Sequence, residues 1–188
     1  MKIDEIKPLL QQIFGSGEIK QEGDDNWQVE QDDLRLLVIL SEDRAWLRIL
    51  IPIIPLAEAQ PFLVQLLAAN FDLTQEVRYA LEQNVLWGVF FHRLESLVAE
   101  DFCSAIAILI ALKQKGLGDA FQQLIEQRIR QIVKASKAQG QSLEDTYKTL
   151  ERFYQEGMLG DLDRDPQERE NFLAAWRYQL ERLWSEVE

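Results

Sequence analysis

The spacing of apolar residues in the first quarter of the chain changes from helical to alternating. Residues 3–14 carry apolar side chains three and four positions apart, which predicts one amphipathic helix. An acidic passage rich in turn residues, 18–26, follows it. Residues 27–30 then alternate like a strand, and 34–40 and 46–54 are β-type runs. We expect these three segments to form a three-stranded meander.

In the middle of the chain a second predicted helix is followed by a predicted hairpin and a third helix. Residues 56–70 are helical in spacing, with a regular part expected from about Gln60 because Pro61 is acceptable only in a first turn. A hairpin is predicted next, in which the strand 85–93 is apolar on both sides and should be covered on both faces. A largely apolar helix over 96–113 completes this part.

Three more helices are predicted after Gly116, each with a single apolar stripe and each expected to dock on another element. Start signals stand at Asp119, at Ser142 and at Asp165 with the following Pro166. The expected fold is α+β: a helix-β-β-β-helix-β-β-helix core with an antiparallel sheet over residues 1–116, and a helical extension over 117–188 packed on that core.

Charge and composition exclude several classes of function. The net charge is −12, and acidic residues outnumber basic ones on both sides of Gly116, so no basic surface for nucleic acid is expected. Apolar runs are too short to span a membrane, and the acidic Asp4 and Glu5 stand where a secretory signal would be basic. We therefore predict a cytoplasmic protein, without membrane insertion, that binds no nucleic acid.

Residues with catalytic or metal-binding chemistry are few. The single histidine, His92, lies in an apolar strand, and the single cysteine, Cys103, is interpreted as a small buried residue. With one of each, a zinc site built on these ligands cannot form within one chain. The residues Asp161, Asp163 and Asp165 open like a calcium loop but lack its glycine and its final glutamate. We predict no cofactor, no metal and no enzymatic activity.

Three of the five tryptophans, Trp27, Trp46 and Trp87, fall on predicted strands. Such rings dominate both protein cores and binding surfaces, so both interpretations stay open, and the partner-binding hypothesis rests on these three residues. The strand that is apolar on both sides needs a second covering layer: a subunit mate, the C-terminal helices or a bound client. The apolar helix from Phe102 to Leu112 predicts a homodimer.

Part of the chain resembles the type III secretion chaperone family, whose pattern is a leucine-rich helix that closes at asparagine, a hairpin and then a long apolar helix. The resemblance is carried by residues Leu66 to Phe71, the strands 77–81 and 85–91 and the helix after Leu97. The resemblance covers about residues 1–115. It implies an α+β protein, commonly a homodimer, that holds an extended segment of a client protein. The alternative is a scaffold or assembly subunit that binds a stable complex through its C-terminal helices.

Overall fold

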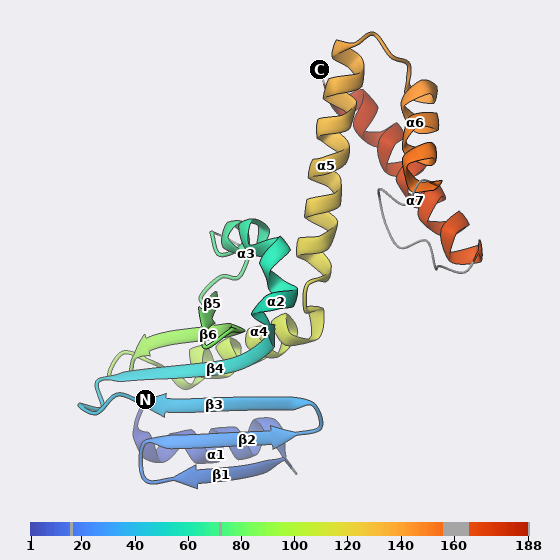
Figure 1. Cartoon of the computed structure of the whole chain (residues 1–188). Coiled ribbons are helices and arrows are strands. Elements are labelled where there is room, and N and C mark those ends of the chain that lie inside the picture. Colours follow the sequence, from blue (N-terminus) through green and yellow to red (C-terminus); the bar gives the residue numbers. More distant parts are fainter. Residues whose placement is uncertain (16, 72, 156–165, 188) are drawn as a thin grey trace. The chain divides into compact units, whose positions relative to one another are not determined.

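The computed structural model describes residues 1–15, 17–71, 73–155 and 166–187. The chain forms two compact units, Met1–Ala120 and Phe121–Glu188. The first unit contains the sheet, and the second contains most of the last three helices (Figure 1).

The first unit is built on one six-stranded antiparallel sheet with the strand order β1-β2-β3-β4-β6-β5. Its turns use residues in the left-handed region, such as Asp32 between β2 and β3 and the pair Gln83 and Asn84 between β5 and β6. The predicted α+β class and antiparallel sheet are confirmed. The strands are β1 (Glu18–Glu22), β2 (Asn26–Gln31), β3 (Leu34–Leu40), β4 (Trp46–Pro55), β5 (Arg78–Glu82) and β6 (Val85–Arg93).

Strand β1 was not predicted from the sequence. It lies in the passage interpreted as turns, so the three-stranded meander is in fact four-stranded. Its only apolar side chain is Ile19, and the remaining residues are charged or amide. The backbone of β2 supplies the pairing, and Lys20 forms ion pairs with Glu18 and with Glu30 on β2. Because no alternating apolar pattern marks such an edge strand, sequence periodicity could not reveal it.

Two helices, α1 (Ile3–Phe14) and α4 (Ala99–Lys115), cover one face of the sheet. Between β4 and β5 the chain forms α2 (Leu56–Ala59), a 3₁₀ helix (Gln60–Phe62) and α3 (Leu63–Ala69). The single helix expected there is therefore interrupted at Pro61, because proline has no N–H to donate.

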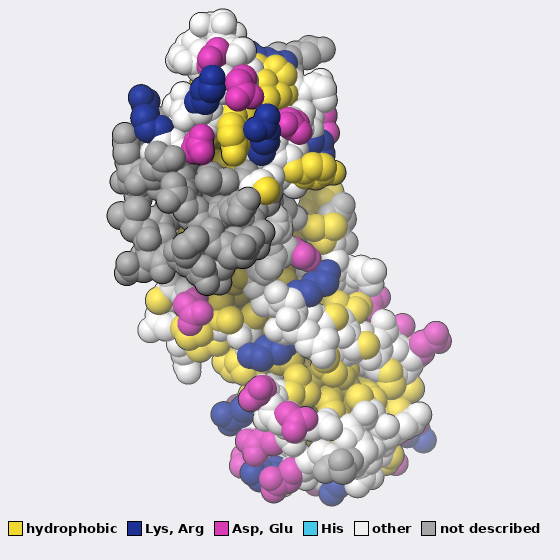
Figure 2. Space-filling view, turned by 90° about the vertical axis from the view of Figure 1, so that its right-hand side faces the viewer, with side chains coloured by type: hydrophobic (Ala, Val, Ile, Leu, Met, Phe, Trp, Pro, Cys, Tyr) yellow, Lys and Arg dark blue, Asp and Glu magenta, His cyan; other side chains and the backbone are white. Residues whose placement is uncertain are grey.

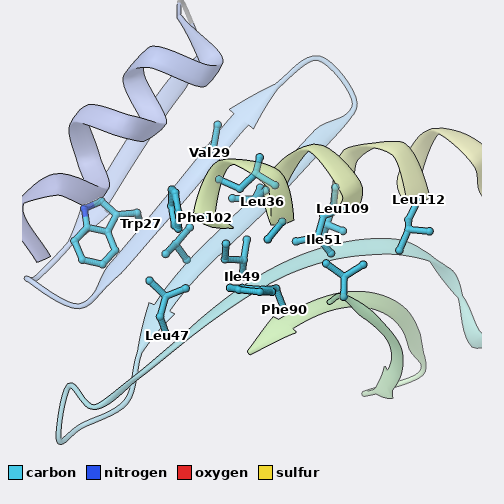
Figure 3. Packing of buried hydrophobic residues seen from close by; sticks show 14 of the residues in the cluster. Trp27, Val29, Leu36, Leu47, Ile49, Ile51, Phe90, Phe102, Leu109 and Leu112 are labelled. Carbon is cyan, nitrogen blue, oxygen red and sulfur yellow. The ribbon is translucent and has the colours of Figure 1, made fainter. Parts of the chain in front are cut away.

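The core of the first unit lies between this sheet face and the two helices. Figure 3 shows strand side chains such as Ile49, Ile51 and Phe90 directed toward Phe102 and Leu109 of α4. All five are buried. Helix α4 contributes its buried stripe of Phe102, Ala105, Ile106, Leu109 and Leu112 to this layer.

The last three helices are α5 (Gly118–Ala138), α6 (Leu143–Gln155) and α7 (Pro166–Glu186). The second unit has its own small core, and the carboxylates of Glu126 and Glu186 lie between the guanidinium groups of Arg130 and Arg182. Asp161, Asp163 and Asp165 lie outside the described residues. The buried core residues are Ile129, Val133, Leu150, Trp176, Leu180 and Leu183.

Candidate protein-interaction surface

The pleat of the sheet gives its central strands two faces that carry similar apolar side chains in different surroundings. On the face that we call the closed face, these side chains meet α1 and α4 and are buried. On the other, the open face, they are only partly buried, and Phe91 is 52% exposed. The apolar residues of the open face are Leu37, Ile39, Trp46, Leu50, Pro52, Trp87, Val89 and Phe91.

Strand register joins these residues into one continuous surface. Leu37 of β3 lies across from Leu50 of β4, which lies across from Val89 of β6. Pro52 and Trp87 form a further cross-strand pair on the same face. The sequence predicts that β6 is covered on both faces. On the open face, however, Phe91 and its neighbours are partly exposed in this chain.

One end of the open face carries a stack of aromatic and guanidinium groups. The rings of Trp46 and Phe91 are nearly parallel, with an interplanar angle of 7° and centroids 4.8 Å apart. The guanidinium carbon of Arg93 lies 5.2 Å from the Trp46 ring centroid, and that of Arg48 lies 5.4 Å from the Phe91 centroid. Arg93 faces Trp46, and Arg48 faces Phe91, across the β4–β6 ladder. Each arginine thus makes a cation–π contact at the surface.

The three tryptophans predicted as partner-binding residues lie on different faces. Trp27 is only 1% exposed and belongs to the closed face (Figure 3). Trp46 and Trp87 both lie on the open face, in opposite halves of the β4–β6 ladder, and the indole N–H of Trp87 donates to the Glu82 carbonyl at 3.1 Å. Partner binding therefore stays a prediction for Trp46 and Trp87, whereas Trp27 is a core residue.

A second apolar surface surrounds α3 and was missed in the sequence. Val64, Leu67, Phe71, Leu73 and Leu81 are all exposed, Phe71 to 91%. Next to them is an apolar hollow of about 200 Å³ lined by side chains of α3, β5 and β6. We call these five residues the α3 surface. The signal that could have revealed it is the leucine and valine content on every side of this short helix.

Hydrophobic side chains also remain visible over much of the first unit in the side view of Figure 2, among charged ones. The open face and the α3 surface thus group exposed apolar side chains, whereas ordinary surface apolar residues stand singly.

The outer edge of β5 is occupied by a side chain. The backbone N–H of Tyr79 donates to Oδ1 of Asn70 at 2.7 Å, and Nδ2 of Asn70 donates to the Tyr79 carbonyl at 3.1 Å. The amide of Asn70 thereby makes the two hydrogen bonds that a neighbouring strand would make here. A client strand cannot add at Tyr79 while Asn70 holds this position.

His92 and Cys103, the single histidine and the single cysteine of the chain, lie on different elements, β6 and α4. Nδ1 of His92 lies 2.8 Å from the Arg93 carbonyl, and burial raises the pKa of the Cys103 thiol. Among the residues described, no group of three histidine, cysteine or acidic side chains could hold a metal ion. No helix in the described ranges is both long and apolar enough to cross a bilayer.

Searches for similar proteins give matches only in structure: no family model and no curated protein matches the chain. Similar structures include the HopA1–SchA chaperone–effector complex (TM-score 0.46, 13% identity, 62% of this chain and 97% of that chain). They also include the Yersinia pestis type III secretion chaperone SycH with a fragment of YscM2 (TM-score 0.48, 14% identity, 61% of this chain and 99% of that chain). A third is the ExsC–ExsE complex (TM-score 0.48, 12% identity, 61% of this chain and 95% of that chain). The similar structures thus include a type III secretion chaperone, a member of the family that the sequence pattern resembles.

Proposed function

We propose that this protein is a non-catalytic binding module that holds an extended segment of another protein against the open face of its sheet. The observation that carries the proposal is the contrast between the two faces: α1 and α4 bury one, whereas the apolar residues of the other stay partly exposed. An extended segment presents alternate side chains on one side, which suits a pleated apolar surface.

The position of the aromatic residues favours the face of the sheet over its edge as the binding site. Trp46, Trp87 and Phe91 lie on β4 and β6, which are inner strands. At the β5 edge, Asn70 already fills the hydrogen-bonding position beside Tyr79. The cytoplasmic location and the alternative role as a scaffold subunit stay predictions.

Site-specific photocrosslinking in cells tests this proposal. A photoreactive amino acid replaces Val89 on the open face, and a control places it at Glu58, an exposed position on α2. We expect discrete protein adducts from position 89 that are absent from position 58 and that decrease when Trp87→Ser is added. Identical adduct patterns at both positions, or no adducts at position 89, would contradict the proposal.

We further propose that the chain forms a homodimer through the α3 surface. The sequence-based argument used the helix from Phe102 to Leu112, but α4 directs its buried stripe onto the sheet of its own chain. The α3 surface instead places large apolar side chains in solvent, including Leu67 at 68% and Phe71 at 91% exposure. Covering such residues by a second copy would remove apolar area from water at about 25 cal/mol per Å².

Light scattering during size-exclusion chromatography tests the dimer. We expect a dimeric mass for the wild type and a monomeric mass for Leu67→Asp. The control is Val98→Asp, because Val98 is a similarly exposed apolar residue outside the α3 surface. A monomeric wild type, or a dimer that survives Leu67→Asp, would show that this assignment is wrong while leaving client binding untested by this experiment alone.

A further inference from the structure

The open face carries two arginines beside its aromatic pair. The protein has a net charge of −12, yet two arginines, Arg48 and Arg93, flank the aromatic pair at one end of the inner strands β4 and β6. Among the residues that the structure describes, no carboxylate lies within ion-pair distance of either guanidinium. By contrast, Arg130, Arg177 and Arg182 of the second unit all pair with glutamates. Positive charge is therefore left uncompensated where the surface is most aromatic.

The stack orients these arginines for binding. Trp46 and Phe91 are stacked too closely to admit a third planar group between them, so the two guanidinium groups lie on the outer sides of the pair. A guanidinium that rests on a ring keeps its N–H donors directed outward in its own plane. Two N–H donors on one edge of a guanidinium bind a carboxylate through two parallel charge-assisted hydrogen bonds.

We infer that the stack formed by Arg93, Trp46, Phe91 and Arg48 selects an acidic extended segment, with acidic side chains on either side of an apolar one. This inference rests on the proposed function and names the class of segment that the open face takes. Side chains on one side of an extended chain recur every two residues, and positions four apart are separated by about 13 Å. Two acids separated by one apolar side chain on the same side can thus reach both arginines while the apolar group covers the rings. A second copy that docked open face to open face would place like-charged arginines opposite each other, so the acidic segment is favoured over such a dimer.

Fluorescence anisotropy with two labelled synthetic peptides tests the inference. The first alternates glutamate, leucine and glutamate with threonine, and the second has glutamine in place of both glutamates. We expect the glutamate peptide to bind about tenfold more tightly, since charge-assisted hydrogen bonds are stronger than neutral ones. Arg48→Gln and Arg93→Gln should each reduce this preference, and added salt should reduce it too. Arg44→Gln, at an exposed turn where Arg44 pairs with Asp24, is the matched control and should leave it unchanged.

The outcomes separate the inference from the proposed function. Equal affinity for both peptides, with crosslinks at position 89 intact, would overturn the acidic preference alone. Binding of neither peptide together with no crosslinks would overturn both. A single-stranded oligonucleotide that binds in preference to the glutamate peptide would overturn the inference in favour of a nucleic acid. A change to monomeric mass in Arg48→Gln or Arg93→Gln would overturn it in favour of a second copy.

Discussion

The two faces of the sheet carry similar side chains and have opposite surroundings. Phe90 and Phe91 are neighbours on β6, yet Phe90 is 1% exposed against α4 and Phe91 is 52% exposed on the open face. Likewise, Trp27 is buried on the closed face and Trp46 is stacked at the surface. Apolar composition therefore does not distinguish a core face from an exposed one. The placement of α1 and α4 makes that distinction.

The largest expected effect comes from replacing Phe90 and Phe91 by alanine, one at a time. Phe90→Ala should lower the free energy of unfolding by about 3–5 kcal/mol, because it leaves a cavity in a packed layer. Phe91→Ala should cost only about 1 kcal/mol, mainly from the lost ring stacking. Chemical denaturation of both variants measures the difference. Equal losses would mean that the open face is covered in the folded protein, which would break the comparison.

Gly88 reports how tightly the closed face is packed. A Cβ atom at this position would lie 2.9 Å from Cδ2 of Leu109 and 3.0 Å from Cγ2 of Ile51. Gly88→Ala should therefore destabilise the protein by about 1–3 kcal/mol, as overpacked cores do. The control is Gly118→Ala, which meets no atom within 4 Å and should be neutral or slightly stabilising. An unchanged denaturation midpoint for Gly88→Ala would show that α4 yields easily.

Asn70 closes one edge of the sheet, and its removal should have a smaller effect. Asn70→Ala deletes both hydrogen bonds to the backbone of Tyr79, at an expected cost of about 1 kcal/mol. The amide of Tyr79 should then exchange with solvent deuterium faster than in the wild type, while the amides of β3 stay protected. The exposed Gln60→Ala serves as control. Unchanged exchange at Tyr79 would show that the Asn70 amide does not protect this edge.

Cys103 on α4 gives the smallest and most local test. Burial raises its pKa, so the reactive thiolate is scarcer at a given pH than for an ordinary cysteine. Alkylation should therefore be slower than that of a free thiol at neutral pH, and it should accelerate as the pH rises toward the raised pKa. Following alkylation by mass spectrometry against pH checks the direction. Alkylation as fast as in the denatured chain would contradict the partial burial of this thiol in the folded chain.

Sequence periodicity predicted α1, the core strands and the hairpin because each has a clear apolar pattern or turn residues suited to left-handed conformations, as at Asn84. It failed for β1, whose place depends on pairing with β2, and it did not foresee that the helix at Pro61 would be split. The candidate site was predicted in part. Trp46 and Trp87 lie on the open face, whereas the stack with Arg48 and Arg93 depends on cross-strand register that a linear pattern does not contain.

The sequence by itself determined the class of fold, the acidic character and the scarcity of catalytic residue types. These follow from local spacing and composition, which need no knowledge of distant contacts. Only the tertiary structure decided which apolar face is core. A strand that is apolar on both sides has two candidate core faces, and long-range packing selects the one that α1 and α4 cover. The same packing left Arg48, Phe91, Trp46 and Arg93 together at the surface, where we propose that a partner binds.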